Sequence, residues 1–141
     1  MKKKNLVLIV EDNEMDMMMI KQDFKSSTNP ISIVEAYDGA AAIDYLVAHQ
    51  HDIKKLPNLI LLDINLPKRN GWEVIDFIKM NEQLKHIPVV IFTTSSAEGD
   101  VLRAYKRQVS CYLVKPFELD EYTEIMKATS HLLIEKAVLP G

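Results

Sequence analysis

The sequence is poor in cysteine, since Cys111 is the only one among its 141 residues. A lone cysteine cannot form a disulfide within the chain, and such usage is typical of a reducing compartment, so we expect a cytoplasmic protein. Long apolar runs are also lacking. The first run ends at Val10, before two acidic residues, and is too short for the core of a signal peptide. No stretch approaches the roughly 20 apolar residues of a membrane span, so neither export nor membrane insertion is predicted.

The chain has no excess of positive charge and no low-complexity segment. Its 17 basic and 20 acidic residues give a net charge of -3. This balance gives no reason to expect nucleic acid or an anionic membrane surface as a partner. The length fits one domain and leaves no room for a catalytic module joined to a separate output module.

Apolar segments alternate with helical patterns along the chain. Three runs rich in Val, Ile and Leu are typical of strands covered on both faces: Leu6–Val10, Leu59–Leu62 and Val89–Phe92. Two weaker segments, Ile31–Ala36 and Cys111–Val114, complete a set of five. After each of them, apolar residues recur at helical spacing. Units of this length predict an α/β fold with an open parallel sheet, right-handed crossovers and helices on both faces.

The residues that follow the predicted strands are polar and unusually acidic. In an open parallel sheet, ligands bind beyond the carboxyl ends of the strands. The residues found there are Glu11 and Asp12 after the first strand, Asp63 after the third, Thr93 and Thr94 after the fourth and Lys115 after the fifth. Of the two threonines only one can face the site, because side chains alternate along a strand. Because neighbouring strands lie about 4.8 Å apart, we expect the acidic side chains to lie within reach of one another.

This acidic cluster predicts a site for a divalent cation and a phosphoryl group. Close carboxylates raise each other's pKa, and a bound cation removes that conflict. Oxygen ligands without His or Cys suit a hard ion, here Mg²⁺, which favours phosphate as a co-ligand. Lys115 adds a positive charge for the phosphate, and the Thr93 hydroxyl adds a hydrogen bond. A carboxylate can itself be the nucleophile, and Asp63, alone after a central strand, is the candidate acceptor.

Four segments carry these residues in order: LVLIVEDNEMD, NLILLDINLPKRNGWEV, IPVVIFTTSS and CYLVKPF. Together they resemble the response-regulator receiver domain, the phosphoacceptor of two-component signalling. The resemblance implies a flavodoxin-like (CheY-like), doubly wound (βα)5 fold whose five-stranded parallel sheet has the order 2-1-3-4-5. It spans about residues 5–131. Residues 1–141 are therefore expected to form a single receiver domain with a short C-terminal extension at 132–141.

The resemblance also implies a role for each site residue. A sensor histidine kinase or a histidine phosphotransfer protein would phosphorylate Asp63. The ligands of Mg²⁺ would be Glu11, Asp12, Asp63 and the main-chain carbonyl of Asn65. The phosphoryl-binding and switch residues would be Thr93, Lys115 and Tyr112, and those that tune dephosphorylation would be Asn65 and Ser95. The domain would catalyse only its own phosphorylation and dephosphorylation, so we do not expect an enzyme.

The resemblance further implies an output through protein contact. The surface formed by the fourth helix, fifth strand and fifth helix is expected to bind a downstream protein or a second copy of the chain. The tail of residues 137–141 is expected, from its apolar residues, either to add to such a dimer contact or to form a disordered end. Thr93-Thr94-Ser95, the long loop before Pro57 and the terminal Leu-Pro resemble the stand-alone regulators that partner bacterial phytochromes.

Two other classes of protein share parts of this pattern. A phosphatase of the haloacid dehalogenase type would also use Asp63 as nucleophile, together with Mg²⁺ and a lysine. That class needs a second acid two residues after the nucleophile, where Asn65 stands here. A flavodoxin-like electron carrier needs a phosphate-binding loop after the first strand, and the acidic pair found there would repel the FMN phosphate.

The segment after the fifth strand carries two further expectations. The Lys115–Pro116 bond is expected to form a cis turn. The last helix is expected to start after Pro116 and to run to about Glu135.

Overall fold

The sheet is built from five parallel strands, as the apolar segments predict. In the computed structural model, which describes residues 5–25, 30–129 and 131, these strands are β1 (Leu6–Val10), β2 (Ser32–Ala36), β3 (Leu59–Leu62), β4 (Val89–Thr93) and β5 (Cys111–Val114). Their order is β2-β1-β3-β4-β5, and every neighbouring pair is parallel. The predicted fold class and strand order are confirmed.

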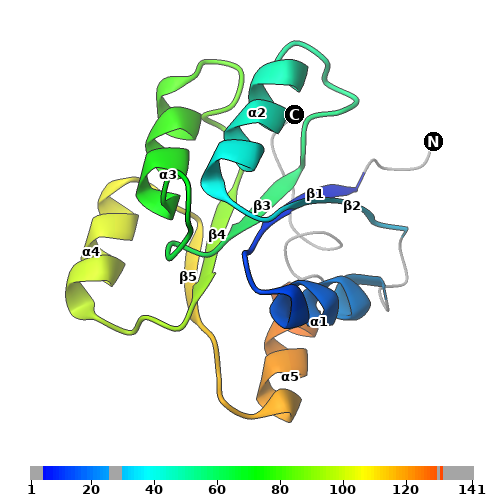
Figure 1. The fold of residues 1–141 in the computed structure, drawn as a ribbon, viewed down its shortest axis with the longest axis vertical. Helices are drawn as coiled ribbons and strands as arrows, with labels where there is room; N and C mark the ends of the chain where they lie inside the picture. Colours follow the sequence, from blue (N-terminus) through cyan, green and yellow to red (C-terminus); the bar gives the residue numbers. More distant parts are fainter. Residues whose placement is uncertain (1–4, 26–29, 130, 132–141) are drawn as a thin grey trace.

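Helices cover both faces of this sheet (Figure 1). They are α1 (Glu14–Lys25), α2 (Gly39–His49), α3 (Gly71–Met80), α4 (Glu98–Lys106) and α5 (Leu119–Thr129). Side chains of a strand alternate between the two faces, so Leu8 and Val10 pack with residues of α2, α3 and α4, whereas Val7 and Ile9 pack with α1 and α5. The central strands β1, β3 and β4 are buried throughout, which explains their continuous apolar sequences. Among the described helices, none is both long and apolar enough to cross a membrane.

The register of the central strands brings the predicted site residues to one edge of the sheet. Val10 pairs with Leu62, so the next residues, Glu11 and Asp63, emerge beside each other. Thr93 is the last residue of β4 rather than the first one after it. The strand therefore extends one residue further than its apolar run indicated.

The chain after β5 departs from both expectations. The described residues contain no cis peptide bond, so the expected cis bond between Lys115 and Pro116 is wrong. The Lys115 N–H still donates to the Thr93 carbonyl at 2.7 Å, and the chain continues beyond the sheet before turning into α5 (Figure 1). An extended exit of this kind needs no reversal at proline and is compatible with the trans bond that prolines usually prefer. Helix α5 is described over Leu119–Thr129, and most of the expected continuation, residues 130 and 132–135, lies outside the described residues.

The loop between β3 and α3 is held against the start of α2. The Asp38 carboxylate caps α2. The N–H groups of Gly39 and Ala40, in the first turn of α2, donate to the carbonyls of Pro67 and Lys68 at 3.3 and 2.8 Å, respectively. These bonds satisfy helix donors that have no partner within the helix, and they fix the loop that follows Asp63.

Candidate functional site

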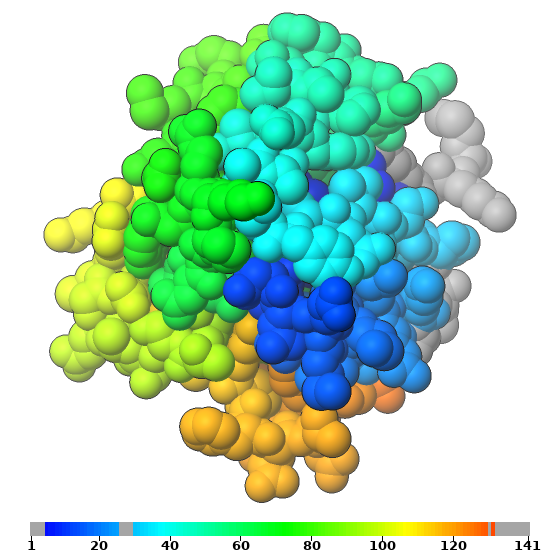
Figure 2. Space-filling model, in the orientation of Figure 1, coloured from blue at the N-terminus to red at the C-terminus, as the bar shows by residue number. Residues whose placement is uncertain are grey.

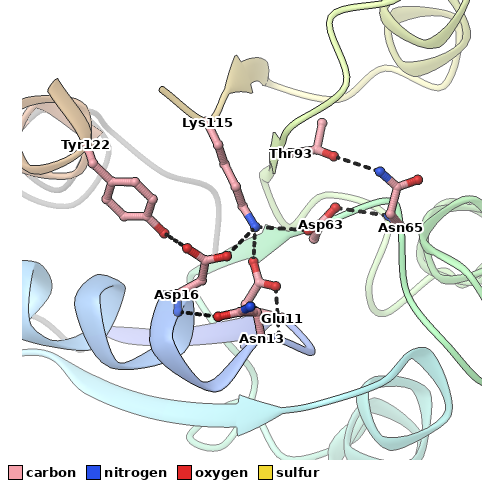
Figure 3. A network of polar contacts seen from close by, with 8 residues as sticks. All are labelled: Glu11, Asn13, Asp16, Asp63, Asn65, Thr93, Lys115 and Tyr122. Carbon is pink, nitrogen blue, oxygen red and sulfur yellow. Dashed lines mark hydrogen bonds and ion pairs between the residues drawn. The ribbon is translucent and has the colours of Figure 1, made fainter. Parts of the chain in front are cut away.

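The ammonium group of Lys115 is the centre of a buried ionic cluster at the carboxyl edge of the sheet (Figure 3). Its Nζ lies 2.5 Å from Glu11 Oε1, 3.0 Å from Asp63 Oδ2 and 3.1 Å from Asp16 Oδ2. Glu11, Asp63 and Lys115 are buried, with 2%, 7% and 8% of their surfaces exposed. A lysine has three N–H donors, so each of them has one carboxylate acceptor.

Burial and charge shift the titration of this cluster. Burial raises the pKa of Glu11 from its ordinary 4.5 to about 7, against the lowering effect of Lys115, and the charge of Asp63 adds to the increase. Burial alone would lower the pKa of Lys115, but its hydrogen bond with Glu11 and the charge of Asp63 outweigh burial and raise that pKa above its usual value. One cation thus faces three acids, and the excess of negative charge is the electrostatic condition that a divalent cation relieves.

Three carboxylates of the described residues are placed to share such a cation. Glu11, Asp12 and Asp63 each offer an oxygen, and these oxygens lie within 4.8 Å of one another. Asp12 is exposed whereas the other two are buried, so the cluster opens to solvent on one side. An all-oxygen donor set with an open side suits a hard ion that keeps bound water, such as Mg²⁺. The residues therefore fit the predicted metal.

Thr93 and Asn65 lie on the other side of Asp63. The Asn65 N–H donates to Asp63 Oδ1 at 3.0 Å, and the Asn65 side-chain amide donates to the Thr93 hydroxyl at 3.4 Å. Thr93 is completely buried. Both carboxylate oxygens of Asp63 are therefore held, one by Lys115 and one by the backbone of Asn65.

Tyr112 and Ser95 are hydrogen-bonded to each other rather than to the clustered carboxylates. The Tyr112 hydroxyl donates to the Ser95 carbonyl at 2.9 Å, and the Ser95 hydroxyl donates to Asp100 at 2.6 Å. Burial raises the pKa of Tyr112. Among the hydrogen bonds of the described residues, Tyr112 therefore contacts the segment between β4 and α4, and Ser95 contacts α4. Neither side chain is bonded to Asp63 among them. The structure thus connects them to the segment that follows Thr93.

Two residues of the cluster, Asp16 and Tyr122, were not identified from the sequence. The Tyr122 hydroxyl donates to Asp16 Oδ1 at 3.3 Å, which continues the network from Lys115 to α5. Helical spacing does not connect Asp16 to the acidic pair, because Glu11 and Asp12 precede α1, which begins at Glu14. The apolar pattern of α5 predicts that Tyr122 is buried, but it gives no information about the partner of its hydroxyl.

A separate hollow of about 320 Å³ lies at the opposite edge of the sheet. It is lined by residues that precede β3 and β4, among them His51, Pro57, His86 and Pro88. None of the clustered carboxylates lines it. This hollow is therefore separate from the candidate site, which lies at the carboxyl edge of the sheet.

The raised pKa of Glu11 predicts a pH dependence of stability. The folded chain binds a proton on the Glu11 carboxyl more tightly than the unfolded chain does. The contribution of this proton to the free energy of unfolding is therefore fully present below pH 4.5 and is lost as the pH rises through about 7. In metal-free buffer, the wild type should lose up to about 3 kcal/mol of unfolding free energy relative to Glu11→Gln across that range. Urea unfolding of both proteins at a series of pH values measures the difference. A difference that stays constant from pH 4.5 to 7.5 contradicts the prediction.

Comparisons with known proteins agree with the geometry of the site. A model of the response regulator receiver domain matches residues 7–127. The response regulator Rcp1 of Synechocystis sp. is 38% identical over 137 residues, which cover 96% of this chain and 93% of that protein.

Solved structures give the same result. The Mn²⁺-bound form of response regulator Rcp1 has a TM-score of 0.90 and 38% identity, with 97% of this chain and 99% of that chain covered. The phosphorylated cyanobacterial phytochrome response regulator RcpA has a TM-score of 0.91 and 36% identity, with 99% and 100% covered. These findings do not support the haloacid dehalogenase alternative. The second acid that this class needs is also absent, because Asn65 stands in its place. The chain belongs to the response regulator receiver domain family.

Proposed function

We propose that this protein is a phosphoryl-receiving switch in which Asp63 takes a phosphoryl group from a phosphohistidine of a sensor histidine kinase or a histidine phosphotransfer protein. The observation that carries the proposal is the fixed orientation of the Asp63 carboxylate, with Oδ2 on Lys115 and Oδ1 on the Asn65 N–H. In the transfer, an Asp63 oxygen forms a bond to phosphorus. The P–N bond breaks, its electron pair goes to the imidazole, and an acyl phosphate remains on Asp63.

The neighbouring residues have distinct parts in this step. Glu11, Asp12, Asp63 and the main-chain carbonyl of Asn65 would hold Mg²⁺. When bound, this ion would neutralise charge on the phosphoryl oxygens. Lys115 pairs with the new phosphoryl group, and the buried Thr93 hydroxyl turns from Asn65 toward it.

The same residues explain how the signal spreads and how it ends. A movement of Thr93 would shift the segment that follows it. Tyr112 is coupled to this segment because its hydroxyl donates to the carbonyl of Ser95. The shift would therefore change the balance between two arrangements of α4 and β5. Asn65 and Ser95 are the uncharged positions at which loss of the phosphoryl group would be tuned. Phosphorylation and dephosphorylation of the chain itself are the only reactions that we assign to it.

Exposed apolar side chains on the two segments that flank the cluster suit a docking phosphodonor. Met15 and Met18 on α1 are 69% and 64% exposed, and Phe117 and Leu119 after β5 are 104% and 67% exposed. Figure 2 shows the start of α1 (blue) beside the orange segment that leads from β5 to α5. Apolar side chains around a charged pocket are typical of a surface that another protein covers. Because RcpA is a phytochrome response regulator, a kinase of the phytochrome type is the donor that we propose.

The output is proposed to be a protein contact through α4, β5 and α5. Leu102, Tyr105 and Val114 are exposed on these elements and would bind a downstream protein or a second copy of the chain. We propose that residues 1–141 act as one receiver domain with its core at about 5–131, and that it acts in the cytoplasm, where the free Cys111 stays reduced. The expected contribution of 132–141 to a dimer lies outside the described residues.

Chemical phosphorylation tests this function. Incubation with Mg²⁺ and acetyl phosphate should add one phosphoryl group, stable in acid and labile in base, and peptide mapping should find it on Asp63. The Asp63→Asn variant should give no adduct, whereas Asp44→Asn, an exposed aspartate on α2, should label as the wild type does. No adduct on the wild type, or an undiminished adduct on Asp63→Asn, contradicts the proposal. Steady release of phosphate from many substrates would favour a phosphatase instead.

A further inference from the structure

We propose that Asp16 is a positioning residue that keeps Lys115 directed at Asp63 during phosphoryl transfer, and that the Tyr122 hydroxyl holds Asp16 in place. This inference rests on the proposed function. Lys115 has three acceptors. In the proposed function, two of them have a second role: Glu11 would bind the metal ion and Asp63 would form the bond to phosphorus. Asp16 is the remaining acceptor in the observed cluster.

Asp16 belongs to a part of α1 that is firmly anchored. Its N–H donates to the side chain of Asn13 at 2.9 Å, a helix-capping bond that fixes the first turn. The next residue, Met17, and Ile20 one turn later are buried against the sheet. The carboxylate of Asp16 therefore starts from a rigid backbone and reaches the end of β5 from the side opposite Asn65.

Both oxygens of Asp16 are engaged, and by different elements. Oδ2 accepts from Lys115 after β5, and Oδ1 accepts from Tyr122 on α5. Tyr122 is itself fixed, because it is 4% exposed and its ring meets Phe92 edge to face at 5.0 Å between centroids. Burial and the charge of Asp16 raise the pKa of Tyr122, so its hydroxyl keeps the proton that it donates. The network in Figure 3 thus joins α1, β5 and α5 through one carboxylate.

Lysine needs such an anchor more than other cations do. Its ammonium is a point charge on a flexible stem of four carbons, without the rigid planar fork of arginine. If Glu11 turns to a metal ion, Nζ keeps only Asp63 and Asp16 as charged partners in this cluster. Two fixed acceptors on opposite sides define where the ammonium sits, whereas one does not.

Asp16 is distinct from the metal-binding set. The carboxylates whose oxygens converge among the described residues are Glu11, Asp12 and Asp63, and Asp16 is not among them. A variant at Asp16 should therefore slow phosphorylation much more than it weakens Mg²⁺ binding. A metal ligand would change both quantities together.

The experiment compares Asp16→Asn with Glu14→Gln, which removes an exposed charge from the same turn of α1. With acetyl phosphate and saturating Mg²⁺, Asp16→Asn should be phosphorylated about tenfold more slowly, the effect of losing one charge-assisted hydrogen bond. Glu14→Gln should match the wild type, and Asp16→Glu should recover part of the rate. Calorimetric titration should show the Kd for Mg²⁺ unchanged within about threefold in Asp16→Asn.

The role of Tyr122 is tested by a double-mutant cycle. Tyr122→Phe should slow phosphorylation by about threefold, yet it should have no further effect when added to Asp16→Ala, because Asp16→Ala removes both oxygens through which Tyr122 and Lys115 are joined. In metal-free buffer, Tyr122→Phe should lower the urea midpoint of the wild type but not that of Asp16→Ala, where the hydroxyl has already lost its acceptor. This second measurement does not depend on phosphorylation.

The outcomes separate this inference from the proposed function. If the wild type and Glu14→Gln acquire phosphate on Asp63 and Asp16→Asn does so equally fast, only the positioning role is overturned. An equal loss of rate and of Mg²⁺ affinity in Asp16→Asn also overturns it and makes Asp16 part of the metal site. Additive effects of the two substitutions overturn the role of Tyr122. If no protein is labelled, the proposed function itself fails.

Discussion

Replacing Lys115 by methionine is expected to lower the free energy of unfolding by about 3 kcal/mol at pH 8. Methionine fills much of the volume of the lysine stem but supplies no charge. Glu11 and Asp63, which are 2% and 7% exposed, then face each other without the cation that both now contact. Removing one partner of a buried ionic cluster is costly because the remaining charges stay poorly solvated.

The loss should depend on pH in a defined direction. Without Lys115, the pKa of Glu11 rises further above its present value of about 7, because the lowering effect of the ammonium is gone. Near pH 5 Glu11 is protonated, so the variant should lose clearly less stability there than at pH 8. An equal loss at both pH values contradicts this account and points to lost packing of the lysine stem.

A matched control removes a lysine from an ion pair at the surface. Lys21 Nζ lies 3.0 Å from Glu35, with side chains 30% and 33% exposed. Lys21→Met should cost no more than about 1 kcal/mol, as is usual for pairs that water screens. Urea unfolding of both variants in chelator gives the comparison. Adding Mg²⁺ to Lys115→Met should recover part of the loss, since the proposed metal site uses the same carboxylates.

The parts of the fold and site that the sequence predicts well are those set by short-range rules. Strands buried on both faces have to be apolar throughout, so β1 and β3 are found at their predicted bounds. Parallel strands end at a common edge, so Glu11, Asp63 and Lys115 could be brought together from their places after strands alone.

The parts that were missed depend on the rotation of helices and on single side chains. The bond from Asp16 to Lys115 depends on how α1 is rotated about its axis and on the side-chain conformations of both residues. The hydroxyl of Tyr122 meets Asp16 only because α5 packs beside α1, and an apolar pattern predicts burial without naming the partner. The expected cis bond before Pro116 rested on the preference of proline in tight turns, whereas the extended exit from β5 removed the need for one.

Gly39 shows a further constraint that composition does not reveal. A Cβ atom built on it would lie 1.6 Å from the carbonyl oxygen of Arg69, so the first residue of α2 has to be glycine for the loop after β3 to pass so close. The loop is not free to withdraw. Lys68 and Arg69 have positive φ angles of 46° and 69°, and the Lys68 carbonyl accepts from the Ala40 N–H at 2.8 Å.

Gly39→Ala is therefore expected to destabilise the protein by about 3 kcal/mol, near the upper end for overpacking by a single methyl group. Gly99→Ala is the control, because nothing lies within 4 Å of a Cβ atom built at that position in α4, and it should stabilise by about 0.5 to 1 kcal/mol. The same loop carries Asn65, a proposed metal ligand, so Gly39→Ala should also weaken Mg²⁺ binding whereas Gly99→Ala should not. Urea unfolding and calorimetric titration measure the two effects. Equal stability of the two variants would mean that the loop yields, and that its bonds to α2 do not fix the backbone beside Asp63.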